Sequence, residues 1–177
     1  MKIFHRAPKT TKKPNMDGVN LLVSILVCYP EIVTVSYEPK EEALRFAFGL
    51  KCVPDKASFK KVASYLAESV RAYQDLEGYE GASVEFYIEG QEGTSFFYVV
   101  RDVRTLSRGE INLLADIMQD FYGEKLMLGE TQEPYDEEEE MMREEALDHM
   151  IGNLRATRIG DRMVGIREEG RVLVFNR

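Results

Sequence analysis

Residues 31–50 read EIVTVSYEPKEEALRFAFGL, and this stretch decides the fold class. Before the turn at 38–42, Val33, Val35 and Tyr37 would share one face, with Ile32, Thr34 and Ser36 on the other. Four apolar residues return at the same period after the turn: Leu44, Phe46, Phe48 and Leu50. Side chains of a strand alternate between its two faces, so the pattern predicts an antiparallel hairpin with one apolar face.

The same order of signals recurs further along the chain. Alternating stretches at 84–88 and 95–103 flank a second turn, 89–93. An apolar stripe at helical spacing follows each hairpin, one opened by Asp55 and closed by Gly78, the other opened by the S-x-x-E capping box of Ser107 and closed near Gly123. The sequence therefore predicts a tandem ββα arrangement, either a duplication or two unrelated units of like design.

Three more elements flank this tandem. Residues 17–28 are apolar nearly all round and fit a buried helix capped by Asp17, or a strand, in either case ended by Pro30. Residues 136–154 predict a helix whose acidic first turn suits the helix dipole. Its expected apolar stripe is Met142, Ala146, Met150 and Leu154, with Leu147 and Ile151 beside it. A last hairpin is expected at 163–167 and 171–175.

These elements predict an α+β fold, a two-layer sandwich in which an antiparallel sheet built from the tandem ββα-ββα carries its helices on one face. A C-terminal helix and β-hairpin are added to it. We expect a mobile basic arm at 1–14, a core domain at 15–128, a polar linker at 129–135 and an appendage at 136–177. The inner face of the sheet would hold Val35, Phe46, Phe48, Val84, Phe86 and Ile88.

The strand around Phe96-Phe97-Tyr98-Val99 carries large apolar residues on both of its faces. A sheet with one face in water does not need them, so part of the outer face is expected to be covered. The candidates are the helix at 17–28, the C-terminal helix and hairpin, or a second copy of the chain in a homodimer.

Composition excludes several classes of protein. The chain has 177 residues, of which 44% are apolar and 31% charged, and its formal net charge is −8. It is long enough to bury a core and too apolar to be disordered throughout. The longest apolar run, 19–28, is too short to span a membrane, and no signal peptide is recognisable. Two cysteines do not make a disulfide framework. We expect a cytoplasmic, acidic protein.

The charges are segregated along the chain. Residues 1–14 carry five basic groups and no acid, whereas 130–145 carries nine acids and one base. One interpretation is that the basic ends bind a polyanion. The candidate residues for that role are Lys9, Lys12, Lys13, Arg155, Arg158 and Arg162. The other interpretation is that these basic groups fold back onto the acidic segment of their own chain.

The motifs of common enzymes are absent. The sequence contains no G-x-x-x-x-G-K-[ST], G-x-G-x-x-G or G-x-S-x-G pattern. His5 lies in the basic arm, and Glu145 with His149 forms a helical pair without a second histidine. Cys28 and Cys52 have no C-x-x-C spacing and are interpreted as structural thiols. No catalytic residue, metal site or cofactor is therefore predicted, and an enzyme assembled from scattered acids is the least favoured hypothesis.

The absence of a catalytic motif, together with the expected apolar surface, favours a non-enzymatic protein-binding, adaptor or chaperone-like module. Its partner would be another protein or a second copy, and the candidate contacts are Tyr87, Met142 and Met150. The alternative is an RNA- or DNA-associated factor that uses the basic arm and the C-terminal arginines.

The element order α-ββ-α-ββ-α over 17–123 resembles the layout of type III secretion chaperones and the related YbjN-like domains. That resemblance implies a dimer with extended hydrophobic surfaces and carries over no functional residue.

Overall fold

The computed structural model describes residues 16–130, 136–157 and 159–176. The described elements, in chain order, are α1 (Met16–Cys28), β1 (Ile32–Glu38), β2 (Ala43–Leu50), α2 (Lys56–Leu76), β3 (Val84–Gln91), β4 (Thr94–Asp102), α3 (Arg108–Tyr122), the short 3-10 helix η1 (Gly123–Lys125), α4 (Glu137–Ala156), β5 (Met163–Glu168) and β6 (Arg171–Asn176). No helix among these residues is long and apolar enough to cross a membrane.

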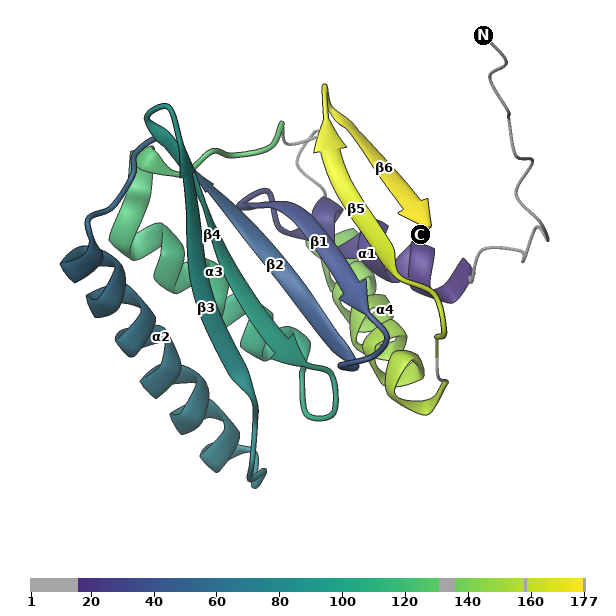
Figure 1. Ribbon diagram of the computed structural model, residues 1–177. Coiled ribbons are helices and arrows are strands. Elements are labelled where there is room, and N and C mark those ends of the chain that lie inside the picture. The colour runs from purple at the N-terminus through teal and green to yellow at the C-terminus, as the bar shows by residue number, and fades with distance from the viewer. Residues whose placement is uncertain (1–15, 131–135, 158, 177) are drawn as a thin grey trace, which may run out of the picture.

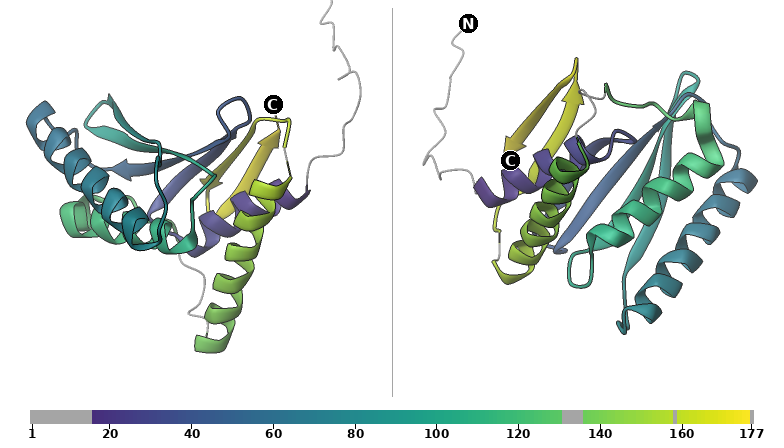
Figure 2. Two further views of the ribbon diagram at one scale, coloured as in Figure 1. Left: turned by 90° about the horizontal axis from the view of Figure 1, so that it is seen from below. Right: turned by 180° about the vertical axis from the view of Figure 1, so that it is seen from behind.

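The strands form one antiparallel sheet in the order β3-β4-β2-β1-β5-β6 (Figure 1). The two ββα units place β2 beside β4, and the last hairpin continues the sheet because β5 pairs with β1. The helices pack on one face, as the views from below and from behind show (Figure 2). The predicted α+β fold with two layers is therefore confirmed.

The inner face of the sheet forms the core. Phe46 pairs with Val35 on one side and with Val99 on the other, and Val99 pairs with Phe86, so four strands align their apolar residues in one row. Phe46 and Val99 are completely buried. All six residues expected on this face lie there.

The start of the first strand, β1, differs from the prediction. Ile32 pairs with Phe48, but Thr34 pairs with Ala47, so the register shifts at Val33. A bulge inserts one residue and reverses the facing of everything before it. Ile32 is consequently buried in the core rather than on the outer face, and Val33 is only half-buried.

Helix α1 lies against the C-terminal hairpin at close range. A Cβ atom at Gly165 of β5 would stand 3.1 Å from Leu26 Cδ1 and 3.3 Å from Leu22 Cβ, so glycine permits this approach. Helices α2 and α3 cover the other half of the sheet, where Phe59 of α2 packs on Phe97 with ring centroids 5.2 Å apart.

Helix α4 packs on α1 and α3, on the side away from the sheet (Figure 2). Its buried residues are Leu147, Ile151 and Leu154. The expected stripe at Met142 and Ala146 is wrong, because both side chains are exposed. The first turns of α4 expose Met141 and Met142, which are 61% and 66% exposed.

Three of the expected helix caps and the expected last turn are present, whereas Asp17, expected to cap the first helix, lies inside the first turn of α1, which begins at Met16. Asp55, Ser107 and Asp136 each accept a hydrogen bond from the backbone N–H three residues on, at the start of α2, α3 and α4. The hairpin β5–β6 turns through Glu169 and Gly170, whose φ angles are 49° and 73°. Positive φ at both positions is the type I′ turn that matches strand twist.

Candidate functional site

The helix-free face of the sheet carries exposed aromatic side chains. The sequence predicted a cover within the chain as one candidate, but every described helix lies on the opposite face and β5–β6 extends the sheet instead of folding over it (Figures 1 and 2). Among residues 16–130, 136–157 and 159–176, no helix or strand covers the outer face, and the side chain of Met127 lies over it at Gly49. Its apolar side chains are therefore available for contact with another molecule.

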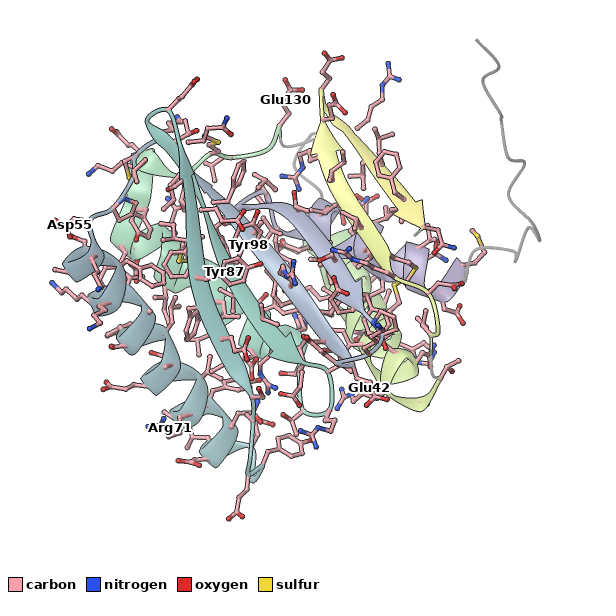
Figure 3. The ribbon with its side chains drawn as sticks, in the orientation of Figure 1. Glu42, Asp55, Arg71, Tyr87, Tyr98 and Glu130 are labelled. Carbon is pink, nitrogen blue, oxygen red and sulfur yellow. The ribbon has the colours of Figure 1, made fainter. Side chains whose placement is uncertain are left out.

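Three aromatic residues gather on this face, and we call them the aromatic shelf: Tyr87 of β3 with Phe96 and Tyr98 of β4. Tyr87 and Tyr98 are cross-strand partners whose rings stack with centroids 4.5 Å apart and an angle of 15° between planes (Figure 3). The ring of Phe96 lies 6.4 Å from that of Tyr98. Phe96 is 38% exposed, so the shelf presents an apolar edge to solvent.

Small residues of β2 form the floor beside the shelf. Ala47 pairs with Tyr98, and Gly49 pairs with Phe96. Ala47 is only 2% exposed, because its larger neighbours overhang it. The space over Gly49 is filled by Met127, whose Sδ would stand 2.9 Å from a Cβ atom at that position, so the rings of the shelf are flanked by a second apolar side chain.

Charged groups border the shelf on both sides. The Arg45 guanidinium carbon lies 5.8 Å from the Tyr87 ring centroid, within range of a cation–π contact. Glu85 and Glu89 lie on the same face of β3 and are exposed. Partial burial raises the pKa of both Tyr87 and Tyr98, and the nearby carboxylates add to the rise for Tyr98. Both phenols are therefore neutral donors at physiological pH.

A cavity of about 910 Å³ opens at the C-terminal end of α1, between α3, α4 and the β5–β6 turn. Its lining includes Tyr29, Arg108, Asn112 and Arg167. The Tyr29 hydroxyl donates to Asn112 Oδ1. Arg108 forms ion pairs with Glu144 and Asp148, which link α3 to α4.

Arg167, one of the other arginines that line the cavity, binds the end of α1. Its guanidinium donates to the carbonyls of Leu26, Tyr29 and Pro30, and the bond to Pro30 is 3.0 Å. Burial lowers the pKa of Arg167. Both Arg108 and Arg167 are thus occupied in holding the fold together.

The cavity does not contain the parts of a nucleophilic site. Burial raises the pKa of Cys28, which keeps its thiol protonated, and both free cysteines are half-buried. No group of three or more His, Cys, Asp or Glu residues among the described residues could hold a metal ion.

Two of the six residues predicted to bind a polyanion, Arg155 and Arg162, lie among the described residues, and they contact different parts of the chain. Arg155 donates to the Arg104 carbonyl at 3.5 Å, and Arg162 Nε lies 2.7 Å from Glu38 Oε1 across the β1–β5 border. The other four, Lys9, Lys12, Lys13 and Arg158, lie outside the described residues.

The predicted protein-contact residues lie on three different surfaces. Tyr87 is part of the shelf. Met142 is 66% exposed on the first half of α4. Met150 is half-buried against α1, where its sulfur accepts a hydrogen bond from Ser24 Oγ at 3.4 Å.

The sequence did not identify Phe96 or Tyr98 individually as contact residues. The strand was recognised as apolar on both sides, but the face of each ring depends on register. The useful signal is the alternation of Phe96, Tyr98 and Val100 with Phe97 and Val99, since Phe97 and Val99 belong to the core.

Comparison with protein-family models, with curated proteins and with solved structures finds no match to this chain.

Proposed function

We propose that this protein is a non-enzymatic protein-binding module that receives a segment of its partner on the aromatic shelf. The observation that carries the proposal is the combination of a helix-free sheet face with stacked, partly exposed rings at Tyr87, Phe96 and Tyr98. Tyrosine and phenylalanine supply large contact area at low cost in conformational entropy, which is why aromatic residues dominate binding hot spots.

The border of the shelf favours a partner segment that combines large apolar side chains with lysine or arginine. Glu85 and Glu89 would meet the basic groups, and the stacked faces of Tyr87 and Tyr98 would attract a guanidinium. The chain as a whole carries a formal charge of −8, so long-range attraction acts in the same direction.

The same border disfavours nucleic acid on this face. Aromatic rings on an open sheet can stack bases, but such surfaces also carry basic groups for the phosphates. Arg45 lies 3.9 Å from Glu38, and Arg162 also pairs with Glu38, so the two arginines near the shelf are partly neutralised. Two further carboxylates, Glu85 and Glu89, stand beside the rings.

Selection of peptides tests the proposal directly. The full-length protein is immobilised and panned with a random peptide display library, and recovered peptides are measured by fluorescence anisotropy. We expect sequences rich in aromatic and aliphatic residues next to Lys or Arg. The double variant Phe96→Ala/Tyr98→Ala should weaken them at least about tenfold, equivalent to about 1.4 kcal/mol.

A matched control uses the other exposed aromatic pair. Tyr65 of α2, 52% exposed, contacts Phe121 of α3 with centroids 5.3 Å apart, on the helical side of the molecule. Tyr65→Ala should leave peptide binding unchanged. Binding that survives loss of the shelf would refute the assignment. Salt-sensitive binding of mixed-sequence RNA or DNA oligonucleotides that is lost in the shelf variant would replace the protein partner with a nucleic acid.

A further inference from the structure

Strand β6 forms one end of the sheet, and its outer edge has no partner among the described residues. The two-residue turn at Glu169 and Gly170 makes Glu168 and Arg171 the hydrogen-bonded pair that closes the hairpin. Alternation along the strand then turns the backbone groups of Val172, Val174 and Asn176 toward the open edge.

This edge lacks the features with which proteins usually prevent pairing. Residues 171–176 contain no proline, lysine or glycine, and the register with β5 is unbroken along the strand. The side chains of Leu173 and Phe175 lie on the face of β6 away from the helices, and they are 37% and 49% exposed. An apolar, regular and open edge is a template for an additional strand.

Helix α1 adds an apolar stripe to the same end of the molecule. Leu22 and Leu26 face the sheet at Gly165, and Ser24 faces α4. At 3.6 residues per turn, Met16, Val23 and Val27 share the remaining side with the exposed Asn20. Met16 is 59% and Val27 42% exposed. Val23 and Val27 line the cavity together with Val172 of β6, so this stripe adjoins the strand and is open to a further molecule.

The stripe and the open edge lie at one end of the fold. Helix α1 packs against β6, and its first turns reach past that strand in both the front and the rear views (Figures 1 and 2). A molecule that adds a strand to β6 would therefore also meet α1.

From this juxtaposition we propose that the β6 edge and the α1 stripe bind a second copy of the chain. The two copies are related by a two-fold axis perpendicular to the sheet, so that β6 pairs antiparallel with β6 of the partner subunit and the sheet continues through the interface. The α1 helices then meet beneath it. A two-fold interface needs one patch that is complementary to itself, and this end of the molecule meets that requirement.

The sequence of β6 supports self-pairing centred on Leu173. In that register Val172 lies opposite Val174 of the partner subunit, and both residues have outward backbone groups to exchange. Arg171 lies opposite Phe175 of the partner subunit, a pairing of a guanidinium with a ring. No like charges are opposed, and Leu173 meets its own copy on the axis. A foreign strand would have to reproduce this pattern by chance.

Sedimentation velocity over a dilution series tests the proposal on the full chain. We expect a species of twice the 20.3 kDa chain mass that dissociates on dilution. Val27→Glu should raise the dimer dissociation constant at least about tenfold, because it places a carboxylate on the apolar stripe. Val53→Glu is the matched control, since Val53 is 51% exposed at the opposite end of the sheet, beside Gly90. Circular dichroism confirms that both variants fold.

Disulfide trapping tests the register independently. Leu173→Cys should form an intermolecular disulfide under mild oxidation, because the two residues face each other in a non-hydrogen-bonded pair with Cα atoms about 4.5 Å apart. Phe175→Cys should not, and neither should the wild type with Cys28 and Cys52.

A monomer at about 100 µM would overturn the proposal. A dimer that neither weakens with Val27→Glu nor cross-links through Leu173→Cys would overturn it as well. The aromatic shelf lies outside this interface, so loss of peptide binding and loss of dimerisation are separate results.

Discussion

Arg101 of β4 and Glu110 of α3 form an ion pair in which neither side chain is exposed to solvent. Arg101 Nε lies 2.7 Å and Nη2 3.1 Å from the two carboxylate oxygens, and Gln74 of α2 also donates to Glu110. The remaining guanidinium hydrogens reach Thr105 Oγ1 and both the carbonyl and the carboxylate of Asp102, which is a second ion pair. One buried charge pair thus joins the sheet to both helices of the tandem.

Removing one partner of this pair should be costly. Glu110→Gln would leave the buried Arg101 charge with Asp102 as its one carboxylate partner among the described residues, so we expect a loss of about 3 kcal/mol in the free energy of unfolding. Urea denaturation followed by circular dichroism measures it. The double variant Arg101→Met/Glu110→Leu removes both charges and should be more stable than Glu110→Gln alone. Equal losses in the two variants would mean that the charge is not what matters.

Arg167 should be needed to hold the end of α1. Arg167→Met keeps the aliphatic stem but leaves the carbonyls of Leu26 and Pro30 without their donor, at an expected loss of about 2–3 kcal/mol. Arg167→Lys retains the charge but cannot reach several carbonyls at once, so its loss should be intermediate. Hydrogen exchange of residues 26–30 should accelerate in both variants. Arg71→Met, on the exposed side of α2, serves as the control.

Tyr122 should make the protein sensitive to alkali. Burial, aided by nearby Cys52, raises the pKa of Tyr122 to about 12, against an ordinary 10.0. The fold therefore favours the neutral phenol, and this contribution to stability is complete below about pH 10 and is lost as the pH rises toward 12. Tyr122→Phe should flatten the decline in melting temperature over that interval.

The same substitution has an expected result at neutral pH. The Tyr122 hydroxyl is buried and has no hydrogen-bond partner among the described residues. Removing an unsatisfied buried hydroxyl should leave stability unchanged or slightly increased. A marked loss of stability in Tyr122→Phe at pH 7 would reveal a partner for that hydroxyl.

The Arg108 ion pairs should control α4 locally rather than the fold globally. Arg108 joins Glu144 and Asp148, whose side chains are 41% and 50% exposed, so salt screens the contacts and each contributes less than about 1 kcal/mol. Arg108→Gln should hardly change the urea midpoint. Protease cleavage within 137–146 should nevertheless become faster, and high salt should mimic the substitution in the wild type. Arg71→Gln, on exposed α2, should show neither effect.

Most elements of this fold were predictable because their signals are local. Period-two alternation located both hairpins, and the capping residues Asp55, Ser107 and Asp136 located three helix starts. The bulge at Val33 was not predictable, because an extra residue is recognised only against the strand it pairs with. Strand order was equally out of reach, since the β2–β4 and β1–β5 pairings join segments far apart in the chain.

The candidate surfaces illustrate the same limit. Tyr87 was identified as a contact residue from its position on the outer face, but its stack with Tyr98 depends on the register between β3 and β4. Arg101 looks like an ordinary surface charge in the sequence, and only the approach of α3 to the sheet makes it the largest fully buried side chain. The capping box predicted the Ser107 cap correctly, since Ser107 Oγ accepts a hydrogen bond from the Glu110 N–H. The Glu110 carboxylate, however, forms the ion pair with Arg101.

The pairing of β5 with β1 has a consequence for synthesis on the ribosome. Helix α1 and β1 emerge early, yet the segments that cover them, α4 and β5, lie more than a hundred residues later. At roughly 5–20 residues per second, a nascent chain would expose the apolar helix for on the order of ten seconds. We therefore expect α1 to be open to chaperone binding during translation until α4 and β5 have emerged.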